Sequence, residues 1–94
     1  MFILYSFNGV EEYAVEDHEI VRLTKPLFNL LGGSPSDMNI CYNILKLAKA
    51  NMQPGDIMYG DPFYTLERVE RYEDRKAFAE TRSSLSEDNF ALIL

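Results

Sequence analysis

The chain has 94 residues, a length that suits one folded unit, so we expect a single small domain over residues 1–94. Its 15 acidic and 9 basic residues give a formal net charge of −6, which argues against direct nucleic-acid binding because contact with phosphates requires a basic surface. No apolar run approaches the ~20 residues that a membrane helix needs, and a single cysteine suits a reducing compartment, so we expect a cytoplasmic protein without membrane contact.

The first predicted elements are two strands, Met1–Phe7 and Val10–Val15, joined by Asn8-Gly9. Asn-Gly between two strand-like runs is the strongest short-range signal for a hairpin with a type I′ turn, in which both central residues have positive φ. The first run is apolar at successive positions, which is typical of an inner strand whose two faces are both covered.

Apolar residues at helical spacing follow from Asp17, which can cap a helix, to the Gly32-Gly33 pair that ends it. Pro26 lies inside this run. A proline in a helix interior removes a backbone hydrogen bond and clashes with the carbonyl four residues earlier. We therefore predict either a kink or two short helices, the second beginning near Thr24 to Pro26.

The stretch from Ser34 to Met52 gives the clearest helical signal in the chain. Ser34 can cap its N-terminus ahead of Pro35, and Pro54-Gly55 ends it. One stripe with the 3.6-residue period is apolar and contains Cys41, Ile44, Leu45, Ala48 and Met52. The two helical segments predict an αα-hairpin whose apolar stripes can cover one face of a sheet.

Two further short strands, Ile57–Tyr59 and Phe63–Leu66, are predicted on either side of the turn Gly60-Asp61-Pro62. A final strand is predicted at Asn89–Leu94, after the polar loop Ser83–Asp88. The element order predicts an α+β domain, with a mostly antiparallel sheet that has an N-terminal β-hairpin and is covered on one face by the αα-hairpin.

The stretch Glu67–Arg82 leaves two alternatives open. Its residue types favour a helix. Its apolar residues do not gather on one helical face, however, which favours a hairpin of Phe63–Tyr72 with Lys76–Thr81 that turns at Glu73–Arg75. We prefer the hairpin.

Residue types that carry catalysis or bind metals are few. His18 and Cys41 are the sole histidine and cysteine, and neither Cys-x-x-Cys nor His-x-x-x-His spacing occurs, so we expect no metal site and no cofactor. A catalytic pair of Cys41 and His18 across the two helices is an alternative to a buried, inert thiol and a surface histidine. The second interpretation is the simpler one, and we expect a protein that is not an enzyme.

The turn between the third and fourth predicted strands is rich in aromatic residues. Tyr59, Asp61, Phe63 and Tyr64 surround it and are our first candidates for a partner-binding patch or for one wall of a pocket. The alternative places Tyr59 and Phe63 in the core and Tyr64 at its edge.

Acidic residues are concentrated near the N-terminus, where no basic residue precedes Arg22. Glu11, Glu12 and Glu16 are our second group of candidates, because such a run can present a negative face to a basic groove. The alternative is a solvated strand edge, which protects a hairpin from aggregation.

Together these features favour a non-enzymatic protein-binding module, a small regulatory or inhibitory protein that self-associates, most simply as a homodimer. One alternative is an acidic phage-type inhibitor that mimics nucleic acid and blocks a nucleic-acid-binding enzyme. Another is a small-ligand protein that binds a nucleotide or metabolite at the aromatic turn or at the glycine-rich turn Gly32–Ser36 before the central helix.

Overall fold

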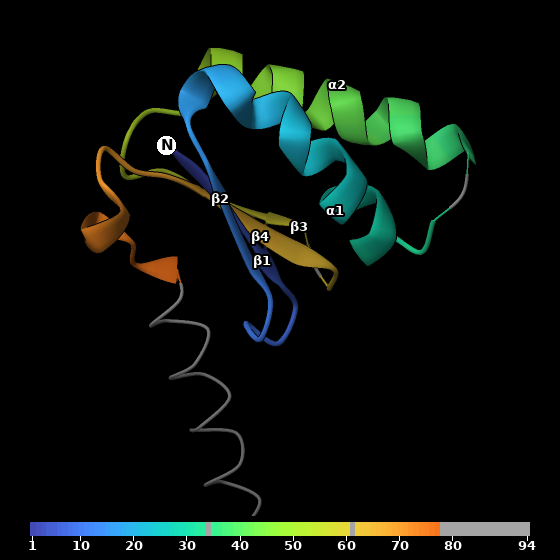
Figure 1. Ribbon diagram of the computed structural model, residues 1–94, viewed down its shortest axis with the longest axis horizontal. Helices are drawn as coiled ribbons and strands as arrows, with labels where there is room; N and C mark the ends of the chain where they lie inside the picture. Colours follow the sequence, from blue (N-terminus) through green and yellow to red (C-terminus); the bar gives the residue numbers. More distant parts are fainter. Residues whose placement is uncertain (34, 61, 78–94) are drawn as a thin grey trace, which may run out of the picture.

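The computed structural model describes residues 1–33, 35–60 and 62–77, and it places helices on one face of a four-stranded antiparallel sheet (Figure 1). The strand order is β2-β1-β4-β3. The strands are β1 (Phe2–Ser6), β2 (Glu12–Val15), β3 (Ile57–Gly60) and β4 (Tyr64–Arg68). The helices are the 3₁₀ helix η1 (Asp17–Leu23), α1 (Thr24–Leu30), α2 (Pro35–Asn51) and the 3₁₀ turn η2 (Tyr72–Asp74). The predicted α+β architecture is confirmed.

Strand β1 is the centre of the sheet. It pairs with β2 on one side and β4 on the other, so that Leu4 lies opposite both Tyr13 and Leu66. Every residue of β1 is buried. Alternate side chains of a strand point to opposite faces, so Phe2 and Leu4 pack beneath the helices while Ile3 and Tyr5 belong to a second cluster. The prediction of an inner strand is confirmed.

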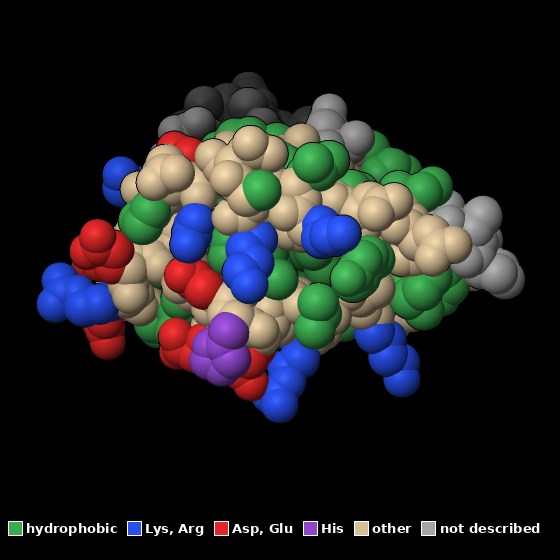
Figure 2. All heavy atoms as spheres, turned by 90° about the horizontal axis from the view of Figure 1, so that it is seen from above, with side chains coloured by type: hydrophobic (Ala, Val, Ile, Leu, Met, Phe, Trp, Pro, Cys, Tyr) green, Lys and Arg blue, Asp and Glu red, His purple; other side chains and the backbone are tan. Residues whose placement is uncertain are grey.

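The helical layer covers the face of the sheet that carries Phe2 and Leu4, called here the first face (Figure 1), and Figure 2 looks onto this layer from above. The apolar stripe predicted for α2 faces the sheet, where Cys41 and Leu45 are fully buried and Ile44 is partly exposed. The predicted buried thiol is thereby confirmed. The predicted division into two short helices near Pro26 is confirmed. The 3₁₀ helix η1 ends at Leu23 and α1 begins at Thr24, so Pro26 lies in the first turn of α1. Within the described ranges, no helix has the length and apolar character needed to cross a membrane.

The opposite face of the sheet, called here the second face, is covered by the chain that follows β4. Val69 and Ala77 pack there against Ile3 and Tyr5. Glu67, on the last half of β4, is fully buried on this face and accepts a hydrogen bond from the Tyr5 hydroxyl at 2.9 Å. No local pattern around Glu67 indicates that this glutamate is a core residue.

Two details of the predicted elements are wrong. Asp17 does not cap η1, because its carboxylate binds the amino group of Met1 and, at 3.0 Å, the guanidinium of Arg68. The turn after β1 is not type I′, because φ is positive at Gly9 (+72°) but not at Asn8. The Asn8 side chain accepts a hydrogen bond from the backbone N–H of Val10 at 3.1 Å, which stabilises a longer loop.

The preferred hairpin in Glu67–Arg82 is also wrong as far as the described residues reach. Strand β4 ends at Arg68 rather than at Tyr72, and neither Lys76 nor Ala77 belongs to a strand. A turn does occur at Tyr72–Asp74, close to its predicted position. The remainder of that hairpin, the loop Ser83–Asp88 and the strand Asn89–Leu94 lie outside the described residues.

Candidate protein-binding surface

Two turns meet at one end of the sheet. Ser6 at the end of β1 pairs with Tyr64 at the start of β4, and Tyr64 pairs with Gly60 at the end of β3. The turn after β1 and the turn after β3 therefore lie side by side. We call the apolar residues of this end the sheet tip: Phe7, Val10, Tyr59, Pro62 and Phe63.

The sheet tip is apolar and open to solvent. The exposed fraction is 64% for Phe7, 72% for Val10, 63% for Tyr59 and 45% for Phe63. Single exposed apolar residues are common on protein surfaces, but contiguous groups mark interaction sites more often. Of the predicted aromatic candidates, Tyr59 and Phe63 are in this group, and Asp61 lies outside the described residues.

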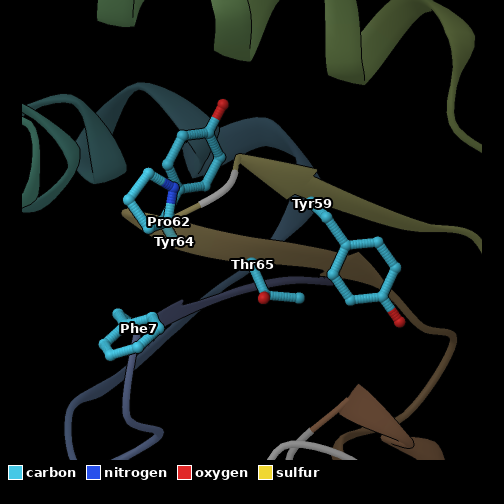
Figure 3. Close-up of a pocket in the computed structure, with 5 residues that line it drawn as sticks. All are labelled: Phe7, Tyr59, Pro62, Tyr64 and Thr65. Carbon is cyan, nitrogen blue, oxygen red and sulfur yellow. The ribbon is translucent and has the colours of Figure 1, made fainter.

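Two hollows flank the Phe7 ring. The first has a volume of about 330 Å³ and is lined by Phe7, Tyr59, Pro62, Tyr64 and Thr65 (Figure 3). Figure 3 shows the Phe7 and Tyr59 rings on the same side of the sheet as Thr65, while the Tyr64 ring points toward the helices. The second hollow, of about 340 Å³, is lined by Ser6, Phe7, Asn8, Val10, Glu11, Leu30 and Phe63.

Tyr64 is a core residue rather than a surface candidate. It shares the helix-facing side of β4 with Leu66, and burial raises the pKa of its phenol. Its ring occupies the space beside Gly60, where an added Cβ would lie 2.1 Å from Tyr64 Cε1. The sequence-based alternative placed Tyr59 and Phe63 in the core and Tyr64 at its edge. The structure shows the reverse, because Tyr64 is buried and the other two are exposed.

The three acidic candidates do not form one face. Glu11 is exposed and lines the second hollow, so it borders the sheet tip. Glu12 points to the second face, where its carboxylate forms an ion pair with Arg75 at 2.7 Å. Glu16 is exposed beyond the other end of β2. Glu11 precedes β2, Glu12 is its first residue and points to the second face, and the length of β2 separates Glu16 from both.

Sequence reasoning missed Phe7 and Val10. Both flank the Asn8-Gly9 turn, and residues beside a tight turn at a sheet end have little to pack against, which is the signal that was available. Their proximity to Phe63 and Pro62 depends on the pairing of β1 with β4, which no local pattern predicts.

The two residues of the candidate catalytic pair, His18 and Cys41, differ in exposure. Cys41 is fully buried on the sheet-facing side of α2, whereas His18 is exposed on η1, so the thiol and the imidazole do not share an open hollow. Residues 1–33, 35–60 and 62–77 contain no group of three or more His, Cys, Asp or Glu side chains arranged to hold a metal ion. The chemistry offered by the two hollows is apolar contact, with Thr65 and Glu11 as polar neighbours.

No protein-family model matches this sequence, and comparisons with curated proteins and with solved structures give no match either. The function is therefore inferred from the surface of the molecule itself.

Proposed function

We propose that this protein is a non-enzymatic binding module that contacts a partner protein through the sheet tip. The observation that carries the proposal is the exposure of Phe7, Val10, Tyr59 and Phe63 together at one end of the sheet. Aromatic residues are enriched in protein–protein interfaces, and a few of them supply most of the binding energy.

The shape of the tip supports a protein partner over a small molecule. Phe7 stands between two separate hollows, so a ligand that filled one would leave the other empty. A protein surface can place one side chain in each hollow and cover the Phe7 ring between them. Glu11 at the rim of the second hollow favours a partner with a basic residue near its apolar contact.

The test is affinity capture from the native host, with the captured proteins quantified by mass spectrometry. The variants Phe7→Asp and Phe63→Asp should each reduce capture of the specific partner by about tenfold or more, as expected for residues that carry interface energy. Val21→Asp is the matched control, because Val21 is an exposed apolar residue on η1. Equal capture by the wild type and both tip variants, with all proteins folded, would contradict the proposal.

A second candidate is an acidic inhibitor that occupies a nucleic-acid-binding groove. Glu11 and Glu16 are exposed and support it, but Glu12 is already paired with Arg75. The charge-reversal test therefore uses Glu11→Lys with Glu16→Lys and leaves Glu12 unchanged. This variant should lose partner binding, and binding of the wild type should weaken as the salt concentration rises. Binding that is unchanged by the charge reversal and by salt would exclude this candidate.

The third candidate is a nucleotide or metabolite ligand in the first hollow, whose volume lies at the lower end of the range for ligand pockets. A ligand present at a hundredfold over its Kd stabilises the folded state by about 2.7 kcal/mol. A thermal-shift panel of nucleotides and metabolites detects such an effect. Binding that is lost in Tyr59→Ala would support this candidate over a protein partner.

A further inference from the structure

The chain that follows β4 covers part of the second face with few apolar side chains. We call residues 69–77 the strap. Val69 and Ala77, at its two ends, are buried, and the residues between them are partly or fully exposed. The two buried side chains pack against Ile3 and Tyr5 of β1. Segments with little buried apolar area open at a lower cost in free energy than the rest of a fold, so apolar packing holds the strap weakly.

Polar contacts attach the far end of the strap to the sheet. The Glu67 carboxylate on β4 accepts hydrogen bonds from the backbone N–H groups of Lys76 at 2.7 Å and Ala77 at 3.2 Å. Arg75 forms an ion pair with Glu12 of β2 at 2.7 Å, and both side chains of the pair are partly accessible to solvent. The attachment of this end therefore depends on one buried carboxylate and one ion pair, together with the small Ala77 side chain.

The strap lies beside the first hollow of the sheet tip. Directly paired residues of neighbouring strands point to the same face of a sheet. Tyr5 pairs with Thr65, and Thr65 pairs with Tyr59, so these three side chains form one row across the second face. Thr65 and Tyr59 line the first hollow, whereas Tyr5 is fully buried in the cluster that contains Val69 and Ala77. The hollow thus adjoins apolar surface that the strap helps to cover.

We propose that the strap opens while the sheet and the helices remain folded, and that its opening extends the first hollow along the second face to Tyr5 and Ile3. Opening breaks the contacts of Glu67 and Glu12 with the strap and leaves the strand pairing intact. Val69 remains the attached end, because its backbone N–H donates to the Met1 carbonyl oxygen at 2.9 Å. The opening does not depend on the function proposed for the sheet tip. Its role, which is to enlarge the surface that a partner contacts, rests on that function.

Native-state hydrogen exchange of the full chain, followed by NMR, measures the opening. The amides of Lys76 and Ala77 should exchange at least about tenfold faster than the amides of β1, which is paired on both sides. Ile20→Val is the matched comparison, because Ile20 is buried on the first face and the variant lowers global stability only. It should speed exchange in β1 and leave the strap amides unchanged. Strap amides that exchange in step with β1 in both proteins would overturn the proposal.

Two variants should open the strap further. Glu67→Gln has one acceptor oxygen fewer and should speed exchange of the Ala77 amide by about tenfold or more. Arg75→Gln removes the ion pair with Glu12 and should speed it by about threefold; its partly exposed position keeps the test available if Glu67→Gln does not fold. Arg71→Gln is the control, since Arg71 pairs with Asp74 inside the strap and not with the sheet. Exchange that is unchanged in Arg75→Gln, or equally fast in Arg71→Gln, would overturn the proposal.

The uncharged dye Nile red, whose fluorescence rises in apolar surroundings, tests the extension of the hollow. A ligand that binds the open form gains apparent affinity in proportion to the fraction of open molecules. The dissociation constant of the dye should therefore fall in Arg75→Gln by the factor by which exchange of the Ala77 amide rises. Adding Phe7→Asp should weaken the dye, since Phe7 lines the first hollow. Dye binding that ignores either substitution would overturn the extension of the hollow.

Partner capture separates this inference from the proposed function. Arg75→Gln should capture more of the protein whose capture Phe7→Asp reduces, by the same factor as for the dye. Equal capture by Arg75→Gln and the wild type would overturn the role of the strap in partner binding. Capture that Phe7→Asp leaves unchanged would instead contradict the function proposed for the sheet tip, while the exchange and dye measurements would still decide whether the strap opens.

Discussion

Tyr5 donates a hydrogen bond to Oε1 of Glu67 across the buried second face, with 2.9 Å between the two oxygens. The same carboxylate accepts hydrogen bonds from the backbone N–H groups of Lys76 at 2.7 Å and Ala77 at 3.2 Å. A buried carboxylate is tolerated when several donors surround it. Glu67 thus ties the chain that follows β4 to the centre of the sheet.

The first prediction concerns the Glu67 carboxylate. Glu67→Ala should lower the free energy of unfolding by about 2–4 kcal/mol, because three donors lose their acceptor inside the protein. Urea denaturation measures this change. Glu70→Ala is the control, since Glu70 is exposed, and it should stay within about 0.5 kcal/mol of the wild type. Similar stabilities for the two variants would contradict the role given to Glu67.

The second prediction concerns alkaline stability. Burial, followed by the hydrogen bond and negative charge of Glu67, raises the pKa of Tyr5 far above its usual value near 10. The unfolded chain ionises near pH 10 while the folded chain holds Tyr5 neutral, so the contribution of Tyr5 to stability is complete below pH ~10 and is lost as the pH rises above it. Denaturation from pH ~8 to ~11.5 should therefore show a shallower alkaline decline for Tyr5→Phe than for the wild type; parallel curves would refute this.

The third prediction concerns acid. The Met1 amino group, and then Arg68, hold the pKa of Asp17 below its usual value near 3.9, against an opposing effect of burial. A depressed folded-state pKa means that the stabilisation is present above pH ~3.9 and disappears as the pH falls through the folded value. Asp17→Asn should flatten this acid-side decline, whereas Glu16→Gln should not. Because Asp17 is partly exposed, the difference should shrink in about 0.5 M salt.

The fourth prediction tests the close packing of β3 on β4. Gly60→Ala should destabilise the protein by about 1–3 kcal/mol, because the new Cβ would overlap the buried Tyr64 ring and force it to move. In a Tyr64→Leu background the added cost of Gly60→Ala should shrink, since the ring is gone. A double-mutant cycle measures the coupling; additive costs would show that the two residues do not interact in this way.

The fold could be predicted because its elements follow from local patterns. The apolar run of β1, the helical period of α2 and the break at Pro26 are each set by residues close together in the sequence. The errors arose where a side chain has a distant partner. Asp17 was expected to cap a helix, but Arg68 binds it from 51 residues away. Glu67 lies in the stretch predicted as a hairpin, and its buried partner Tyr5 is 62 residues away.

The candidate surface was predicted in part for the same reason. Tyr59 and Phe63 stood out because they flank one turn, and both are exposed. Phe7 belongs to the other turn and comes beside them through the pairing of Ser6 with Tyr64, which is a tertiary contact. The grouping of Glu11 with Glu12 failed because Glu11 precedes β2 and borders the sheet tip, whereas Glu12 lies on β2 and points to the second face.

The position of β1 also has a consequence for the newly made chain. Leu4 is synthesised well before its partner Leu66, which emerges only after η1, α1 and α2. Contacts between segments so far apart in sequence form slowly, and uncovered apolar strands are prone to aggregate during the wait. On the ribosome, the most apolar strand of this protein is therefore the one that needs shielding for longest.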